Sequence, residues 1–126
     1  LQRVLTATET VLRGEAAYEQ DGLVFAEAGE PGPALAALLL AAAIDGRLSV
    51  LDLGGALASH YLRWRPWLTH LPILQWHVVE QPHYVESGRA LFAGGTHPVR
   101  FHDRIDEVSG ANAVLASSVL QYLPQP

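Results

Sequence analysis

Apolar and polar positions group along the chain into segments that favour helices and strands in turn. The spacing over residues 1–20 predicts a helix, with apolar positions at Val4, Val11, Leu12 and Tyr18. A short apolar segment, residues 23–25, follows the Asp21-Gly22 turn. Four later apolar runs predict strands at residues 48–53, 73–79, 99–102 and 113–116.

Helical segments are expected before and between these strands. A breaker over residues 29–33 precedes a helix over 34–44, which starts at Pro33 and stops at Asp45-Gly46. Ser59 is expected to cap the next helix, and Pro66 to limit or kink it. Further helical segments are expected over residues 82–92, 105–108 and 119–123.

Alternating strands and helices at this spacing predict an α/β fold with a parallel sheet. We expect residues 1–46 to form an N-terminal helical region, and residues 47–126 to form a Rossmann-like half-domain.

Composition narrows the classes of function. The chain has 126 residues, of which 49% are hydrophobic, enough for one small folded domain. Eight basic residues against thirteen acidic ones give a net charge of −5, which argues against binding to a nucleic-acid backbone. The absence of cysteine excludes disulfides, thiolate catalysis and cysteine zinc sites, and fits a cytoplasmic location. No apolar run reaches the roughly 20 residues that a membrane span needs.

The stretch from Val50 to Ala58 carries the most chemical information. It predicts a buried strand that ends in a small-residue turn, where the backbone can approach a ligand closely. Asp52 lies at the end of that strand, and its charge would repel a phosphate but attract a cation. This combination favours the amino-acid end of S-adenosylmethionine over a dinucleotide pyrophosphate.

Ligands of parallel α/β sheets bind beyond the carboxyl ends of the strands. Glu80, which ends the second strand, is expected to accept hydrogen bonds from ribose hydroxyls, and Asp103 from an adenine amino group. Each acid has an alternative role as a helix cap or a solvated loop carboxylate. The candidate cofactor-binding residues at the four strand ends are Asp52, Gly54, Gly55, Ala56, Glu80, Gln81, Asp103, Arg104, Ser117 and Ser118.

No catalytic base stands out among the remaining residues. His83 lies near the expected site as a candidate base, although a capping or surface role suits it better, and His60 is similarly placed. His77 is expected to be a satisfied sheet residue. No histidine pair has the helical spacing of metal ligands, so no metal site is expected. Ser117 and Ser118 lack a nucleophile-elbow pattern.

At these residues the chain resembles class I S-adenosylmethionine-dependent methyltransferases. More narrowly, it resembles a bacterial methyltransferase family often associated with surface-polysaccharide biosynthesis genes. The resemblance covers most of the chain from about residue 11. The stretches that carry it are residues 14–19 (GEAAYE), 50–61 (VLDLGGALASHY), 76–82 (WHVVEQP) and 117–123 (SSVLQYL).

The resemblance implies a role for each candidate. Asp52 would hold the methionine amino group, directly or through water, and the backbone of residues 54–56 would pass beside the methionine and ribose. Glu80 would bind the ribose hydroxyls, Gln81 would lie against the adenine, and Asp103 would contact its amino group. Ser117 and Ser118 would line the side of the reacting methyl.

The chain departs from the family in two respects. Ala58 stands where such turns usually carry glycine, which is expected to tighten the pocket or shift the backbone. By this resemblance, the chain is also expected to supply only the first four of the family's seven strands, in the order 3-2-1-4. Without its next neighbour, the strand over residues 113–116 would be an exposed apolar edge, through which the chain is expected to pair with a second copy.

Two other functions remain open. An NAD-dependent oxidoreductase or epimerase fits the alternation of strands and helices and Glu80, but not Asp52 or the missing third glycine. A catalytically inactive α/β binding module fits Ala58 and the lack of a base. For a methyltransferase, the acceptor is expected to be a small molecule or saccharide, and the sequence does not identify it.

Overall fold

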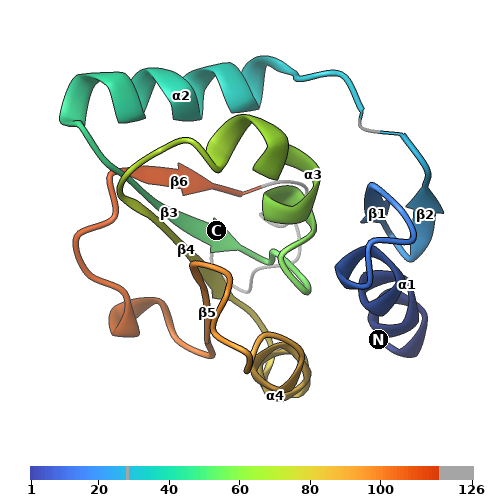
Figure 1. The fold of residues 1–126 in the computed structure, drawn as a ribbon. Coiled ribbons are helices and arrows are strands. Elements are labelled where there is room, and N and C mark those ends of the chain that lie inside the picture. Colours follow the sequence, from blue (N-terminus) through green and yellow to red (C-terminus); the bar gives the residue numbers. More distant parts are fainter. Residues whose placement is uncertain (28, 117–126) are drawn as a thin grey trace.

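The computed structural model of the protein describes residues 1–27 and 29–116. Its elements form an N-terminal helix and hairpin followed by a four-stranded sheet with helices (Figure 1). In chain order they are α1 (Gln2–Leu12), β1 (Tyr18–Gln20), β2 (Leu23–Phe25), α2 (Pro33–Asp45), β3 (Leu48–Leu53), α3 (Ser59–Leu68), β4 (Leu74–Val79), α4 (Pro82–Leu91), β5 (Val99–His102), a 3-10 turn (Ile105–Glu107) and β6 (Ala113–Leu115).

The larger sheet is parallel, with the strands in the order β5-β4-β3-β6. Val50 of β3 lies between Trp76 of β4 and Ala113 of β6, so β3 is covered on both edges. The predicted α/β class with a parallel sheet is therefore confirmed. The predicted strands begin and end within one residue of those observed.

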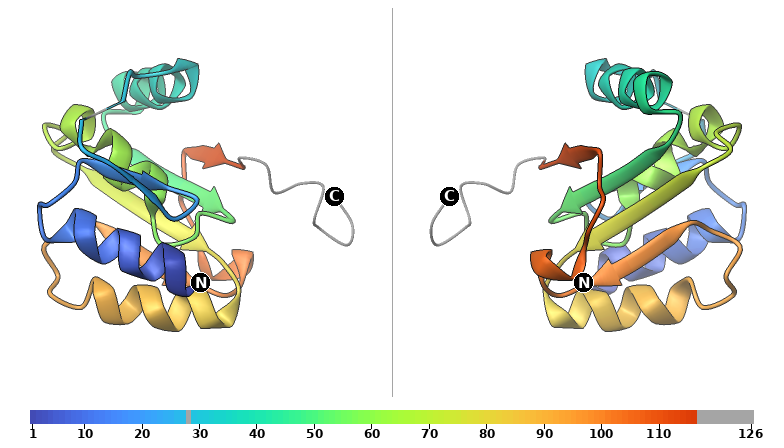
Figure 2. Two further views of the ribbon diagram at one scale, coloured as in Figure 1. Left: turned by 90° about the vertical axis from the view of Figure 1, so that its right-hand side faces the viewer. Right: turned by 90° about the vertical axis from the view of Figure 1, so that its left-hand side faces the viewer.

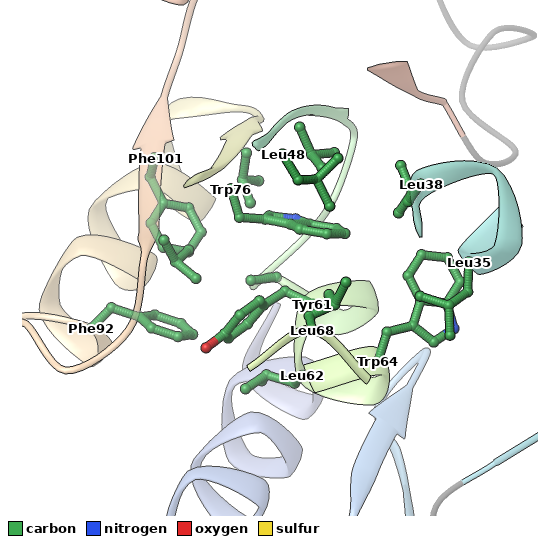
Figure 3. Packing of buried hydrophobic residues seen from close by; sticks show 14 of the residues in the cluster. Leu35, Leu38, Leu48, Tyr61, Leu62, Trp64, Leu68, Trp76, Phe92 and Phe101 are labelled. Atoms are coloured by element: carbon green, nitrogen blue, oxygen red, sulfur yellow. The ribbon is translucent and has the colours of Figure 1, made fainter. Parts of the chain in front are cut away.

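Helices cover one side of this sheet. The views in Figure 2 place α1, α3 and α4 on the same side of the strands. Side chains alternate between the two faces of a strand, so Val50, Trp76 and Phe101 all point toward these helices. Figure 3 shows Trp76 inside the cluster, with Phe92 and Phe101 toward one end and Leu35 and Trp64 toward the other.

Residues 18–25 correct the helix predicted over residues 1–20. The helix ends at Leu12, and β1 pairs antiparallel with β2 across Asp21 and Gly22. Both turn residues have positive φ, 53° and 84°, as a two-residue hairpin with Asp-Gly at its centre requires. The Asp21-Gly22 turn and the stacking of the Tyr18 and Phe25 rings, whose centroids lie 4.6 Å apart, favour the hairpin over the helix that the apolar spacing predicts.

Other predictions have mixed outcomes. The helices expected from Pro33 and from Pro82 are present, and the turn near Ile105 is a 3-10 helix. Ser59 is not a cap: it is the first residue of α3, and Ala58 precedes it in the left-handed region. Pro66 lies inside α3. The helix expected over residues 119–123 lies outside the described residues.

The edge strand β6 presents Val114, which is 63% exposed. Pairing with a second copy through this edge stays a prediction. No helix in the described part of the chain has the length and apolar character needed to cross a membrane.

α4 packs closely against β5 at Gly88, because glycine has no side chain there. A Cβ there would lie 2.5 Å from Phe101 Cε1, well inside van der Waals contact. We expect Gly88→Ala to lower the free energy of unfolding by about 1–3 kcal/mol, because ring and helix must separate. Urea titration followed by circular dichroism measures this. Gly94→Ala is the matched control, since no atom lies within 4 Å of its added Cβ, and an equal loss in both variants would contradict the explanation.

Candidate functional site

The turn between β3 and α3 has an unusual backbone. Gly54, Ala56 and Ala58 all have positive φ, at 67°, 51° and 65°. The left-handed region costs a residue with a Cβ about 1–2 kcal/mol, so the surrounding structure must hold both alanines there. Ala58, expected to tighten the pocket or shift the backbone, keeps this left-handed conformation with its methyl buried in the core.

The Asp52 side chain lies beneath this turn. Its carboxylate is 1% exposed and accepts a hydrogen bond from Trp76 Nε1 at 2.9 Å. Gly55 packs directly on it, because a Cβ at position 55 would overlap the carboxylate oxygens. Burial raises the pKa of Asp52 to about 7, against the lowering effect of the Trp76 hydrogen bond, and the nearby Glu80 raises it further.

Glu80 reaches the same turn from the end of β4. Its Oε2 accepts the Ala56 N–H at 3.0 Å, and its Oε1 accepts the Gln81 N–H at 2.9 Å. A carboxylate has about four acceptor positions, so both oxygens keep capacity for a ligand. Glu80 therefore holds the turn through the Ala56 N–H, and its carboxylate still has acceptor positions for a ligand at the turn.

A cavity of about 270 Å³ adjoins the turn. The N-terminal helix and hairpin form one wall, and α3 and α4 contribute the others. Its lining residues are Val4, Glu19, Gln20, Asp21, Gly54, Gly55, Ala56, Ser59, His60, Arg63 and Tyr84.

Glu19 ties the hairpin to the turn region. It is 1% exposed, and its two oxygens accept hydrogen bonds from the Ser59 hydroxyl and from the Gly22 N–H, the latter at 3.1 Å. The Ser59 hydroxyl therefore does not cap α3. It donates a hydrogen bond to Glu19 and so links α3 to β1. Arg63 adds a second link, because its guanidinium lies 4.8 Å from the centre of the Tyr18 ring and Nη1 donates to Gln20.

His60 of α3 and Tyr84 of α4 both line the cavity. Burial lowers the pKa of His60, and the neighbouring Arg63 lowers it further, which favours the neutral imidazole. The ring stacks on Trp64 with 5.0 Å between centroids. Burial, Glu80 and Glu19 together raise the pKa of Tyr84 and keep its hydroxyl protonated.

The structure brings together only part of the predicted site. Gly54, Gly55 and Ala56 line the cavity, while Asp52 and Glu80 contact the turn itself. Gln81 is exposed at the start of α4, and Asp103 is exposed after β5. The exposed Arg104 pairs with Asp106 at 2.7 Å. Ser117 and Ser118 lie outside the described residues.

Sequence reasoning missed the hairpin wall. The predicted ligand-binding residues do not include Glu19, Ser59, Arg63 or Tyr84. For Glu19 the reason is that the spacing over residues 1–20 predicts a helix, whereas Ser59 is predicted only as a helix cap. The Asp21-Gly22 dipeptide was the one local indication of a hairpin. Within residues 1–27 and 29–116, no group of three or more His, Cys, Asp or Glu residues is placed to hold a metal ion.

No protein-family model matches this chain, and no curated protein matches it significantly.

The raised pKa of Asp52 makes stability depend on pH. Between about pH 4 and 7 the unfolded chain has released this proton and the folded protein retains it, so rising pH favours unfolding. Asp52→Asn removes this dependence. The free energy of unfolding of the variant should therefore rise relative to the original protein by a few kcal/mol from pH 4.5 to pH 8. Urea titrations at both pH values measure the difference, and a constant difference would contradict the raised pKa.

The hydrogen bond from Ser59 to Glu19 can be tested separately. Ser59→Ala leaves a buried carboxylate oxygen without its donor, which should cost about 1–3 kcal/mol of unfolding free energy. The backbone amides of β1 and β2 should exchange with deuterium faster, because the hairpin loses its attachment to α3. Ser109→Ala, at an exposed position of the crossover to β6, is the control. Unchanged exchange in the hairpin would show that this bond does not hold it.

Proposed function

We propose that this chain is the cofactor-binding part of an S-adenosylmethionine-dependent methyltransferase. The observation that supports this best is the contact between Glu80 and the Ala56 N–H. It brings the acid from the end of the second sheet strand against the small-residue turn after the first. A ligand lying along that turn would meet a carboxylate suited to two neighbouring ribose hydroxyls.

The charges around the turn favour this cofactor over a dinucleotide. Glu80 touches the turn, Asp52 lies beneath it, and the buried Glu19 lines the adjoining cavity. Three carboxyl groups near one helix start disfavour a pyrophosphate there. They favour a ligand that carries an ammonium group and a sulfonium, as S-adenosylmethionine does.

The roles divide by accessibility. Glu80 is the residue proposed to contact the ribose, and Gln81 and Asp103, both exposed at neighbouring strand ends, are proposed to face the adenine. Asp52 acts from below: its carboxyl group accepts the hydrogen bond from Trp76 and lies directly against Gly55, which holds the turn in place. The parallel sheet, with the strands in the order β5-β4-β3-β6, is compatible with the Rossmann-like fold that this function requires.

Bound S-adenosylmethionine would supply an electrophilic methyl group, which passes to an oxygen, nitrogen or carbon nucleophile by in-line displacement. The residues described above would contribute mainly by holding the reactants in position. The proposed acceptor is a small molecule or saccharide.

Isothermal titration calorimetry with S-adenosylhomocysteine tests the proposal on the whole chain. We expect binding by the original protein and at least tenfold weaker binding by Glu80→Gln, a loss of about 1.4 kcal/mol. Glu86→Gln, an exposed acid on α4, is the matched control and should bind normally.

Two results would reject the proposal. One is no binding of S-adenosylhomocysteine by a folded protein, and the other is unchanged binding by Glu80→Gln. Binding of NAD in place of S-adenosylhomocysteine would favour an oxidoreductase. Cofactor binding without methyl transfer to any acceptor would favour an inactive binding module.

A further inference from the structure

A second, larger cleft lies away from the small-residue turn, at the edge strand β5. It measures about 880 Å³ and runs between the end of α4 and the outer edge of that strand. Figure 2 shows β5 at the border of the sheet, with α4 beside it. The cleft is lined by Leu74, Gln75, Arg89, Phe92, Ala93, Gly95, Thr96, His97, Pro98, Val99, Arg100, Phe101 and His102.

The charged groups of this cleft all have the same sign. Among residues 1–27 and 29–116, Arg89 and Arg100 line it and no acidic residue does, although the protein carries a net charge of −5. Glu107 and Asp103 act on His102, at one end of the cleft. The positive charge is therefore concentrated at the middle of β5.

The two arginines differ in how they are held. Arg89 Nη2 donates a hydrogen bond to the Phe101 carbonyl oxygen at 2.9 Å, which fixes its guanidinium across the strand edge. Arg100 is exposed, and the described residues provide no hydrogen bond or ion pair to its guanidinium. A guanidinium offers five N–H donors in a planar fork, so both side chains keep donors for an oxyanion.

The backbone of β5 adds donors to the same cleft. Pro98 and His102 direct their carbonyl groups toward β4, where Trp76 N and Glu80 N donate to them. Backbone groups alternate in direction along a strand, so the N–H groups of Val99 and Phe101 point to the open edge. Such N–H groups at a sheet edge form concave sites for anions.

Two histidines, His97 and His102, also line the cleft, and His77 lies next to His102. His102 Nε2 and His77 Nδ1 lie 3.0 Å apart, and His77 Nε2 lies 3.3 Å from Gln75 Oε1, so His77 is satisfied within the sheet as expected. His97 Nδ1 is 2.9 Å from the Tyr61 hydroxyl. Burial lowers the pKa of His77, His97 and His102, and at His102 the nearby Glu107 and Asp103 oppose this effect.

We propose that this cleft binds a small ligand through a phosphate or carboxylate group. Arg100 and Arg89 hold the oxyanion from two sides, and the N–H groups of Val99 and Phe101 donate to it from the strand edge. Arginine matches the geometry of both oxyanions with paired hydrogen bonds, and the ring edges of Phe92 and His97 shape the remainder of the cleft. The proposal is independent of the function of the small-residue turn.

The competing explanation is that these arginines only protect an edge strand. Charged side chains on an edge discourage pairing with other chains. In that case the arginines would bind no oxyanion, and their removal would cause self-association. The two explanations therefore give opposite results in one experiment.

Nuclear magnetic resonance of the whole ¹⁵N-labelled chain tests the site residue by residue. Pyrophosphate and malonate are titrated separately at constant ionic strength, to distinguish a phosphate ligand from a carboxylate ligand. With at least one probe, we expect saturable shifts of the Val99 and Phe101 amides and of the Arg100 Nε–H. Arg100→Gln should weaken that binding at least tenfold, and Arg13→Gln, far along the chain at the end of α1, should not.

Three outcomes would overturn the proposal. They are no saturable shift at β5 with either probe, shifts confined to other parts of the chain, or equal affinity in Arg100→Gln. Arg89→Gln is a second variant, which should also bind weakly if it folds. If Arg89→Gln does not fold, Arg100→Gln keeps the test decisive, because the described residues make no hydrogen bond or ion pair with the Arg100 guanidinium and the substitution leaves the backbone pairing of β5 in place.

Discussion

The hydrogen bond between Asp52 and Trp76 is the interaction on which the centre of this fold depends. It joins Asp52, near the carboxyl end of β3, to Trp76, in the middle of β4, and the same carboxylate supports Gly55 of the turn above it. The charge is almost fully buried, so desolvation opposes ionisation and one indole N–H partly offsets it. The Asp52 carboxylate therefore supports the turn after β3. That turn positions the first residues of α3 and one wall of the cavity.

Much of the fold can be predicted from the sequence because its determinants are local. The strand over residues 48–53 is a nearly continuous apolar run that stops at Gly54, and both ends agree with the structure. Pro33 and Pro82 mark helix starts for a simple steric reason. The hairpin was missed because Tyr18 also fits a helical spacing, and only the positive φ values of its turn decide between the two.

From the sequence, only those residues of the candidate site that lie at the end of a predicted strand or directly after it could be identified. Glu80 could be placed from its position after an apolar run, but its bond to the Ala56 N–H could not. Glu19 is a buried acid whose donor, Ser59, lies 40 residues away in sequence. No periodicity connects two such residues, so contacts of this kind appear only in the folded molecule.

The position of β6 has a consequence for how the sheet is assembled. β3 pairs with β4 through the connection that contains α3, but its other edge is covered by β6, and the Ser49 N–H meets the Asn112 side chain 63 residues later. Closing so long a segment costs conformational entropy before any contact is gained. The central strand is therefore half-covered during early folding, and the step that completes the sheet should limit the folding rate. A chaperone or any other protein that recognises unpaired strands would have its opportunity in that interval.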